Sequence, residues 1–318
     1  MNYLIIFVLL FILELLYFRI ANKFNIFDKP NERSSHTKVT LRGGGIIFWI
    51  AALLYIFSDY STQAIWFFVG ITFLSAVSLA DDIVSLSQRV RLLTHLIAIT
   101  CSFYLANVFN IYPWWAIAIG YLVSVGIINI FNFMDGINGI TGLYSIAVLA
   151  PLQYVNLYIT SFVAHDMIWY PILGSVVFLY FNFRKQAKCF AGDVGSIGIA
   201  FWIVTLLLLL VIETNNLIWM GVLMVYGVDG VCTILHRIYL RQNILKAHRL
   251  HFYQVLANEQ KVQHRVVSVI YFVVQLIVSA LIIFLSPMFG WWMFVLPLVV
   301  LIGLYGLKFR LMTNVIKK

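Results

Sequence analysis

The chain has 318 residues, of which 63% are hydrophobic and only 10% are charged, and its mean hydropathy is +0.96. This composition excludes a soluble domain with a polar surface and predicts an all-α, polytopic integral membrane protein. The formal net charge of +9 is most simply a signal of membrane topology, although it would also attract anionic lipid headgroups or phosphates. We expect a lipid bilayer as a partner and no nucleic acid.

Apolar segments predict the membrane helices. Crossing the hydrocarbon core of a bilayer takes roughly 20 apolar helical residues. We expect about eleven transmembrane helices, which form a single transmembrane domain over residues 1–318. In chain order these segments lie near residues 3–21, 44–58, 64–80, 92–109, 113–131, 140–158, 167–183, 196–212, 216–235, 266–286 and 291–309. The first segment is too long for a signal-peptide core and lacks a small-residue cleavage pattern, so we expect it to remain as a helix.

The basic residues predict the orientation of these helices. When the eleven segments are threaded back and forth, all 21 Lys and Arg fall on one side. The connections on the other side, near Asp59, Asn110, Asp166, Glu213 and Pro287, hold none. Because Lys and Arg in short loops stay in the cytoplasm, we expect the N-terminus outside and the C-terminus inside. Most polar motifs fall on the cytoplasmic side, so we expect the protein to act there.

Two adjacent carboxylates, Asp81 and Asp82, close the third segment. Neighbouring carboxylates repel each other unless cations or hydrogen-bond donors compensate their charge. On a helix they point about 100° apart, so one could reach a metal ion while the other faces a substrate or an arginine. The alternative is a pair of interfacial carboxylates that are bathed in water and paired to Arg89 or Arg91.

A polar stripe ends the fifth segment. Asn129, Asn132 and Asp135 recur every third residue and therefore share one side of a helix. Gly136 and Gly139 then allow the chain to turn away at little steric cost. Polar stripes inside a membrane normally face a cavity or the bundle interior, which favours a functional site. The alternative is a set of hydrogen bonds that hold helices together.

A third acidic residue, Asp193, lies between Gly192 and Gly195 just before the eighth segment. Glycines permit close approach of the backbone to a ligand. A carboxylate at this depth suits Mg²⁺, which prefers oxygen ligands and shares its coordination shell with phosphate and water. A tight turn that caps the following helix would explain the same motif.

Two basic motifs complete the set on the cytoplasmic side. Arg42-Gly43-Gly44-Gly45 is similar to loops whose backbone N–H groups cradle a phosphate, although three glycines also make a flexible entry to a helix. His248, Arg249 and His251 could bind a diphosphate or a metal ion. The alternative for this second motif is a solvated basic loop.

Together and in this order, the motifs resemble the polyprenyl-phosphate N-acetylhexosamine-1-phosphate transferase family, part of glycosyltransferase family 4 and related to the peptidoglycan phospho-MurNAc-pentapeptide translocase. The resemblance covers nearly the whole chain. It includes Asp28-Lys29-Pro30, Arg33-Ser34-Ser35-His36, Arg42 to Gly45, Asp81-Asp82, Leu86-Ser87, Arg91, Asn129 to Gly139, Asn182, Phe190 to Ser196, Asp229 and His248 to His251.

The chain departs from the family pattern at a few positions. Val39 and Leu41 replace frequent prolines, His95 replaces a common Gln, and Asn138 replaces a frequent Asp. The histidine motif reads His-Arg-Leu-His instead of a run of histidines, which is similar to the short O-antigen-initiating branch. Members of that branch often use 6-deoxy N-acetylhexosamines.

The resemblance implies a Mg²⁺-dependent reaction, with Mn²⁺ as a possible substitute. Undecaprenyl phosphate and a UDP-N-acetylhexosamine would give undecaprenyl-diphospho-N-acetylhexosamine and UMP, which starts lipid-linked glycan synthesis such as that of the O-antigen of lipopolysaccharide. The protein would lie in the bacterial inner membrane with its active site on the cytoplasmic face, and a homodimer is possible.

The resemblance also implies roles for individual residues. Asp193 would be the main Mg²⁺ ligand, with Asp81 or Asp82 near the metal and the other acting on the lipid phosphate. Further residues would bind the substrates. The diphosphate would contact His248, Arg249 and His251, and the uridine would contact Asn138, Asn182 and Phe190. The floor of the cleft would be formed by Asn129, Asn132 and Asp135, and phosphate would be contacted by Arg33, Lys38 and Arg42.

Other membrane proteins with clustered carboxylates are alternatives. A secondary transporter would place its site near the midplane and show repeats and interrupted helices, whereas these motifs lie at one face. An intramembrane prenyltransferase would show N-D-x-x-D-type motifs. A CDP-alcohol phosphotransferase would show a D-x-x-D-G … G-x-x-x-D run. We find neither pattern in the sequence.

Overall fold

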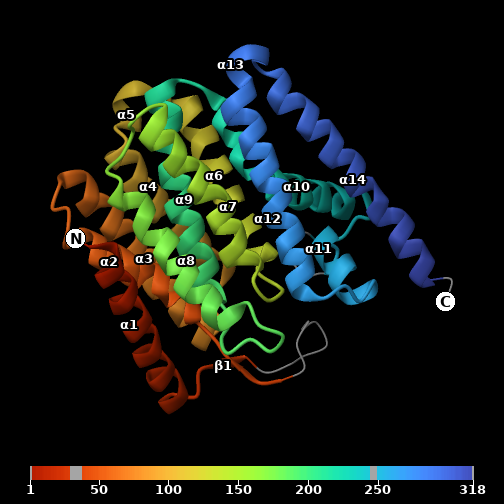
Figure 1. The fold of residues 1–318 in the computed structure, drawn as a ribbon, viewed down its shortest axis with the longest axis horizontal. Coiled ribbons are helices and arrows are strands. Elements are labelled where there is room, and N and C mark those ends of the chain that lie inside the picture. The colour runs from red at the N-terminus through yellow and green to blue at the C-terminus, as the bar shows by residue number, and fades with distance from the viewer. Residues whose placement is uncertain (1, 29–37, 244–248, 317–318) are drawn as a thin grey trace.

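A computed structural model describes residues 2–28, 38–243 and 249–316, without the side chains of residues 63 and 313–316 (Figure 1). It confirms the all-α fold class. The helices in chain order are α1 (Tyr3–Lys23), α2 (Ile47–Ile56), α3 (Thr62–Ile83), α4 (Gln88–Leu105), α5 (Val108–Ile111), α6 (Trp114–Met134), α7 (Ile140–Tyr158), α8 (Asp166–Asn182), α9 (Gly192–Thr214), α10 (Met224–Tyr239), α11 (Phe252–Gln254), α12 (His264–Ala280), α13 (Ser286–Phe289) and α14 (Trp292–Ile316).

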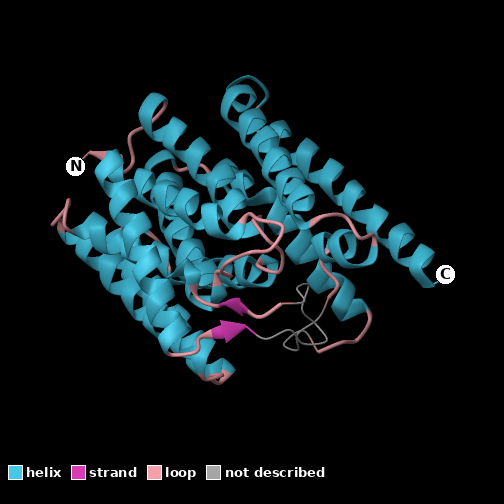
Figure 2. Ribbon diagram, turned by 60° about the horizontal axis from the view of Figure 1, so that its bottom comes forward, coloured by secondary structure: helices cyan, strands magenta, loops and turns pink. Residues whose placement is uncertain are grey.

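Short irregular pieces complete the fold. The 3₁₀ turns η1 (Gly44–Ile46) and η2 (Leu217–Leu223) lead into α2 and α10, and the π-helical turns are η3 (Val255–Glu259) and η4 (Leu281–Leu285). Two two-residue strands, β1 (Phe27–Asp28) and β2 (Thr40–Leu41), pair antiparallel, with Phe27 opposite Leu41 and Asp28 opposite Thr40. Figure 2 shows these strands at one end of the helical bundle.

All eleven apolar segments are helical. In the described part of the chain, eight helices are long and apolar enough to cross a membrane by length and composition. They are Tyr3–Lys23, Ala64–Ile83, Trp114–Met134, Ile140–Tyr158, Gly192–Thr214, Leu217–Tyr239, His264–Phe289 and Trp292–Met312. The other three expected segments correspond to α2, α4 and α8. The number of crossings and their orientation stay predictions.

Side-chain caps set the start of α3, which carries the acidic pair, and of α4, which follows it. The Ser61 hydroxyl accepts the backbone N–H of Ala64 at the start of α3, and the Ser87 hydroxyl accepts that of Val90 at the start of α4. Each bond satisfies one of the N–H groups that a helix leaves without a partner at its N-terminus. α3 and α4 pack side by side, and Asp81 and Asp82 lie in the last turn of α3, next to the connection to α4.

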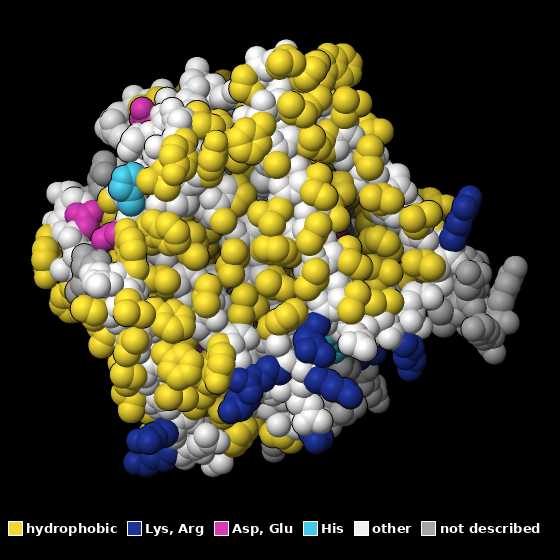
Figure 3. All heavy atoms as spheres, viewed as in Figure 1, with side chains coloured by type: hydrophobic (Ala, Val, Ile, Leu, Met, Phe, Trp, Pro, Cys, Tyr) yellow, Lys and Arg dark blue, Asp and Glu magenta, His cyan; other side chains and the backbone are white. Residues whose placement is uncertain are grey.

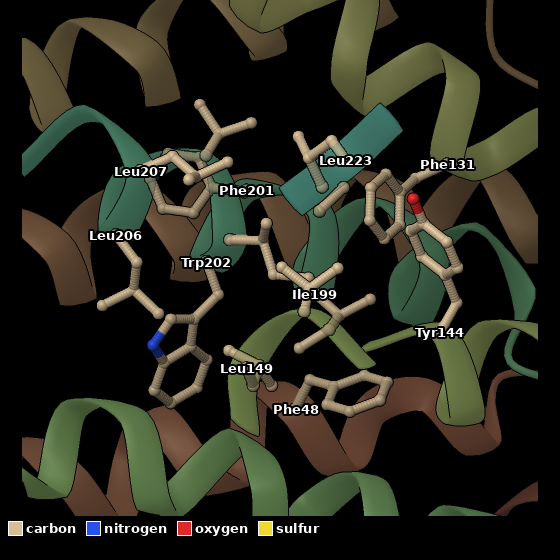
Figure 4. Close-up of a cluster of buried hydrophobic side chains, with 14 of the residues drawn as sticks. Phe48, Phe131, Tyr144, Leu149, Ile199, Phe201, Trp202, Leu206, Leu207 and Leu223 are labelled. Atoms are coloured by element: carbon tan, nitrogen blue, oxygen red, sulfur yellow. The ribbon is translucent and has the colours of Figure 1, made fainter. Parts of the chain in front are cut away.

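α9 forms the centre of the bundle, and α14 lies at its edge (Figure 1). Within the apolar windows of these helices, 78% of the residues are buried in α9 but only 22% in α14. Figure 4 shows Ile199, Phe201 and Trp202 of α9 among side chains from other helices, such as Phe48 and Leu149. Since α9 contacts α2, α3, α6 and α7, residues at its N-terminus meet several elements at once.

Charged and apolar side chains separate on the surface. On the face shown in Figure 3, hydrophobic side chains cover most of the bundle, and Lys and Arg gather along the lower edge and toward the C-terminal end of α14. In the same view, β1 lies at that lower edge (Figure 1). This separation agrees with the one-sided distribution of basic residues that the sequence predicts.

Candidate active site

The carboxylate of Asp82 caps the central helix. It accepts the backbone N–H groups of Asp193 (2.9 Å) and Val194 (3.1 Å) in the first turn of α9. These groups lack intrahelical partners, and the N-terminus of a helix favours negative charge. The motif around Asp193 therefore lies at the start of a helix, as the alternative of a helix-capping turn predicts. The capping side chain, however, is Asp82 of α3. Gly192 adopts a left-handed conformation (φ +70°) that glycine reaches without strain.

Arg42 pairs with Asp82 and approaches Asp193. Its Nε lies 2.8 Å from Asp82 Oδ1, and its second terminal nitrogen lies 3.9 Å from Asp193 Oδ1. Burial lowers the pKa of Arg42, but the carboxylates of Asp82, Asp193 and Asp28 outweigh it and raise that pKa above its ordinary value. The guanidinium is therefore charged and one-third exposed. The hydroxyl of Tyr17 donates to the Arg42 carbonyl (2.7 Å) and fixes the backbone at this point.

The glycines after Arg42 serve close packing. The N–H of Gly44 donates to the Phe190 carbonyl (2.8 Å), and that of Gly45 donates to the Ala191 carbonyl (3.0 Å). A Cβ at Gly45 would overlap the Cα of Gly195 in α9. The expected phosphate cradle is therefore wrong for Gly44 and Gly45, because their N–H donors are used within the protein. The missing side chain of Gly45 lets two backbones touch, and that of Gly44 makes room for the Cys189 side chain.

Asp81 pairs with Arg91. The ion pair is bidentate, with Arg91 Nε 2.7 Å from Asp81 Oδ2 and the second terminal nitrogen of Arg91 3.0 Å from Asp81 Oδ1. The backbone N–H of Leu86 also donates to Asp81 Oδ1 (2.6 Å). The predicted pairing to Arg91 is thus confirmed. The side chains of Asp81 and Asp82 are only 2% and 0% exposed, so the picture of carboxylates bathed in water is wrong.

Asp193 lies between the two arginines. The nearest terminal nitrogen of Arg91 is 4.0 Å from its Oδ2, opposite Arg42 at 3.9 Å from Oδ1. Its Oδ1 accepts Asn132 Nδ2 (3.0 Å). Its side chain is 18% exposed, the most open of the three carboxylates. We name Asp81, Asp82, Asp193, Arg42 and Arg91 the carboxylate cluster.

Of the polar stripe Asn129, Asn132 and Asp135, the last two interact with this cluster. Asn132 donates to Asp193 and also to the Ser196 hydroxyl (3.2 Å). The pKa of Asp135 is raised to about 6, mainly by burial and in part by the nearby Asp193 carboxylate. A hydrogen bond that Thr141 donates (2.6 Å) lowers this pKa but does not offset the burial. Asn129 instead donates to the Val125 carbonyl of its own helix (2.8 Å), so its place in the cleft floor stays a prediction.

Two predicted uridine-binding residues hold loops together. Asn182 accepts the N–H of Gly139 (2.6 Å) and donates to the Cys189 carbonyl (2.8 Å), while Asn138 donates to the Arg184 carbonyl (2.8 Å). Both side chains are buried. Phe190 is half-buried, and its backbone bonds to Leu41 and Gly44. Their contact with a nucleotide stays a prediction.

Asp229 of α10 anchors the histidine motif. Its Oδ1 accepts His251 Nδ1 (3.3 Å) and the Phe252 N–H (2.8 Å), and its Oδ2 accepts the Tyr253 N–H (3.3 Å) and the Tyr271 hydroxyl (2.6 Å). One carboxylate therefore caps the short helix α11 and orients His251. We name the residues that surround this carboxylate the Asp229 anchor.

The anchor lies next to the end of α6. The Tyr253 hydroxyl donates to the Phe133 carbonyl (2.9 Å), and a Cβ at Gly136 would overlap that hydroxyl. The histidine motif thus lies beside the turn that carries Asp135. Arg249 is half-buried in the same segment, while His248 and Arg33 fall outside the described residues. Lys38 is exposed and donates to Gln186 Oε1 (3.3 Å).

Sequence reasoning missed several of these partners. Tyr17, Tyr253 and Tyr271 are not part of any predicted site, yet each fixes one of its elements. An acidic residue within a membrane segment requires partners, so Asp229 was the signal that buried donors such as Tyr271 lie nearby. Arg91 carries a signal in its spacing from Asp81, but its second approach to Asp193 depends on the fold.

The donor set limits how a metal ion can bind. Within residues 2–28, 38–243 and 249–316, no group of three or more His, Cys, Asp or Glu side chains is placed to hold one. Mg²⁺ usually takes only one or two carboxylates and completes its shell with water and substrate phosphates. The partly exposed Asp193 fits such a role. Asp81 would first have to release Arg91.

Comparisons with known proteins match part of the chain to one family. Residues 64–211 match the model of glycosyl transferase family 4. This range includes Asp81, Asp82, Asn132, Asp135 and Asp193, whereas Arg42 and the histidine motif lie outside it.

Two relatives extend the match. A Bacillus subtilis (strain 168) protein, described as a probable undecaprenyl-phosphate N-acetylglucosaminyl 1-phosphate transferase, is 26% identical over an alignment of 256 residues, and the alignment covers 75% of this chain and 71% of that protein. A Methanocaldococcus jannaschii protein named as a candidate glycosyltransferase is 26% identical over an alignment of 157 residues, and the alignment covers 48% of this chain and 50% of that protein. Residues 64–211 are therefore similar to glycosyl transferase family 4, in agreement with the resemblance that the motifs show.

Proposed function

We propose that this protein transfers an N-acetylhexosamine 1-phosphate from a UDP-sugar to undecaprenyl phosphate, releases UMP, and so starts a lipid-linked glycan such as an O-antigen. The observation that carries the proposal is the partly exposed Asp193 carboxylate between the guanidinium groups of Arg42 and Arg91. The family match and the name of the B. subtilis relative support the same reaction class.

The charges of the cluster suit two anionic reactants. Three carboxylates face two guanidiniums, so the fully ionised cluster carries one excess negative charge. That excess favours a bound cation, and Asp193, with Asp81 as second candidate, would hold Mg²⁺ or Mn²⁺. When bound, such an ion would neutralise charge on the diphosphate oxygens. Arg42 and Arg91 lie close enough to Asp193 to contact the same phosphates.

The arrangement favours direct attack by the lipid phosphate over an aspartyl-phosphate intermediate. The second pKa of a phosphate monoester is about 6, so the acceptor is mostly ionised at neutral pH and needs no strong base. Both oxygens of Asp81 and Asp82 are engaged by arginines or backbone N–H groups. A phosphate oxygen would bond to the sugar-bearing phosphorus, the bond to UMP would break, and the protein would supply position and charge.

The remaining polar residues would bind the donor substrate. Arg249 and His251 lie in a segment fixed next to the Asp135 turn, where they would contact the diphosphate together with His248. Asn138, Asn182 and Phe190 would line the uridine site. The site would face the cytoplasm of a bacterial inner membrane, where a soluble UDP-sugar and a lipid phosphate meet.

A direct assay tests the proposal. Purified protein is incubated with undecaprenyl phosphate, Mg²⁺ and a panel of UDP-sugars that includes UDP-N-acetylglucosamine and a 6-deoxy N-acetylhexosamine. We expect equal amounts of UMP and lipid-linked sugar with at least one donor. The name of the B. subtilis relative makes UDP-N-acetylglucosamine the first donor to test.

The outcomes separate the alternatives. Donor uptake into proteoliposomes without UMP would indicate a transporter and contradict the proposal. Release of UMP without a lipid product would indicate a hydrolase. An Arg19→Met variant serves as a control, because Arg19 is an exposed cation of α1 and its loss should leave the rate unchanged.

A further inference from the structure

The last helix carries a buried cation. Lys308 of α14 is fully buried, although α14 is otherwise the least enclosed of the long apolar helices. Its neighbours Leu304 and Leu307 are 45% and 44% exposed. Burying an ammonium group is expensive unless donors and acceptors compensate it. A cation in this position therefore requires a structural reason.

Lys308 begins a continuous line of hydrogen bonds. Its Nζ lies 2.6 Å from the Tyr305 hydroxyl, which lies 3.0 Å from the Thr233 hydroxyl of α10. The Thr233 hydroxyl lies 3.2 Å from Asp229 Oδ1. All four residues are buried. We name these four residues the Lys308 chain.

The chemistry of the end groups sets the direction of this chain. An ammonium can only donate and an ionised carboxylate can only accept, whereas each hydroxyl in between has one proton. Lys308 must donate to Tyr305, Tyr305 then donates to Thr233, and Thr233 donates to Asp229. Each bond polarises the next, so the positive charge of α14 acts on Asp229 through two hydroxyl groups.

Asp229 passes this restraint to the histidine motif. The same Oδ1 that accepts Thr233 also accepts His251 Nδ1 and the Phe252 N–H. In addition, the Thr233 hydroxyl lies 3.4 Å from the Leu250 carbonyl. A residue of the outermost helix is thus connected to the segment that would bind the donor diphosphate.

We propose that Lys308 is a positioning residue, which acts through Tyr305, Thr233 and Asp229 to hold residues 249–254 in their binding conformation. This inference rests on the proposed function for the role of that segment in substrate binding, but the restraint itself is independent of it. Lys308 has no direct part in the chemistry in this scheme.

Three variants test the chain. Lys308→Met removes the charge at similar length, Tyr305→Phe removes only the connecting hydroxyl, and the double variant tests whether they act as one unit. The matched control is Tyr121→Phe, because the Tyr121 hydroxyl also bonds a threonine, Thr100, at 2.6 Å between two other helices. Lys23→Met, at the exposed end of α1, controls for loss of a cation.

The first measurement is hydrogen exchange of the backbone amides of residues 252–259, which needs no substrate. We expect exchange to become about tenfold faster in Tyr305→Phe and Lys308→Met and to stay unchanged in both controls. The double variant should exchange no faster than Lys308→Met alone, because both changes break the same chain. Unchanged exchange in Lys308→Met and Tyr305→Phe would overturn the inference.

The second measurement is steady-state kinetics. We expect KM for the UDP-sugar to rise about tenfold, with kcat within about twofold and KM for undecaprenyl phosphate unchanged, because a displaced binding segment weakens one substrate only. Equal losses for both substrates would indicate general destabilisation and contradict the positioning role. If the unmodified protein releases no UMP with any donor, the proposed function fails, while the exchange result still decides on the Lys308 chain.

Discussion

The carboxylate cluster and the Asp229 anchor both bury acidic side chains, but they satisfy them differently. In the cluster, Asp81 and Asp82 are balanced by arginines, and Asp193 keeps an 18% exposed side chain with its two cations about 4 Å away. In the anchor, one carboxylate accepts hydrogen bonds from His251, Phe252, Tyr253, Tyr271 and Thr233. The cluster retains capacity for a ligand, whereas the anchor is saturated and fixes the backbone.

Removal of metal ions should give the largest difference between the two sites. Thorough chelation with EDTA is expected to abolish UMP release completely, and added Mg²⁺ or Mn²⁺ should restore it, because, of these two sites, the cluster is the one with a partly exposed carboxylate. The same treatment should leave hydrogen exchange at residues 252–259 unchanged. Full activity in EDTA would contradict a metal role for Asp193.

Replacing Asp193 with Asn should lower turnover by about 10³-fold, since an amide oxygen is a weaker ligand and carries no charge. The variant should melt close to the unmodified protein, because its side chain is partly exposed and the amide can still accept from Asn132. UMP release and the thermal midpoint in detergent measure the two effects. A rate near that of the unmodified protein would remove Asp193 from the metal site.

Replacing Asp229 with Asn should reduce stability more than turnover, the opposite of the effect expected for Asp193→Asn. Five donors surround this carboxylate, and an amide would turn its own N–H groups toward some of them. We expect a stability loss of about 2–3 kcal/mol and a higher KM for the UDP-sugar, with kcat less affected than in Asp193→Asn. Asp229→Asn and Asp193→Asn are matched controls for each other. A larger loss of kcat in Asp229→Asn would place Asp229 in the chemistry instead.

The smallest effect concerns Asp135 and pH. Its pKa is about 6 in the folded protein against an ordinary value of 3.8, so folding favours the protonated form. The stability it contributes is full below pH 3.8 and is lost as the pH rises through about 6. Asp135→Asn stays neutral and should therefore be more stable than the unmodified protein by about 1–2 kcal/mol at pH 7.5.

Thermal midpoints of both proteins across pH 4 to 8 check this sign. The difference between them should shrink toward pH 4, where Asp135 is protonated. A constant difference across this range would show that the carboxylate of Asp135 does not titrate as its burial requires.

The helices could be predicted from the sequence because apolar length is a local property. All eleven segments are helical, and the acidic motifs of α3, α6 and α9 meet at one end of the bundle as expected for residues on one face. The irregular pieces could not be predicted in the same way. The π-helical turn η3, for example, follows an anchor that depends on Asp229, more than twenty residues earlier.

The pairing within the site required the fold. Asp82 caps α9 across 111 residues, and Arg42 reaches it from a third segment. No spacing in the chain indicates such contacts. The glycines after Arg42 suggested a phosphate cradle because glycine-rich loops share that composition, and only the partners of Gly44 and Gly45 show that their amides are used internally. Asn138 and Asn182 match a substrate-binding pattern, and only the fold shows that they also bond to neighbouring loops.

The contact between Gly45 and Gly195 has a consequence for substrate choice. Backbone meets backbone there, so no rotamer change can absorb a displacement of α9 against the segment that carries Arg42. The segment that carries Arg42 and the N-terminus of α9 should therefore move as one rigid unit, with a fixed distance between Arg42 and Asp193. Tolerance for sugars of different size must then reside in parts that pack through side chains, and donor specificity should be easier to alter by engineering those parts.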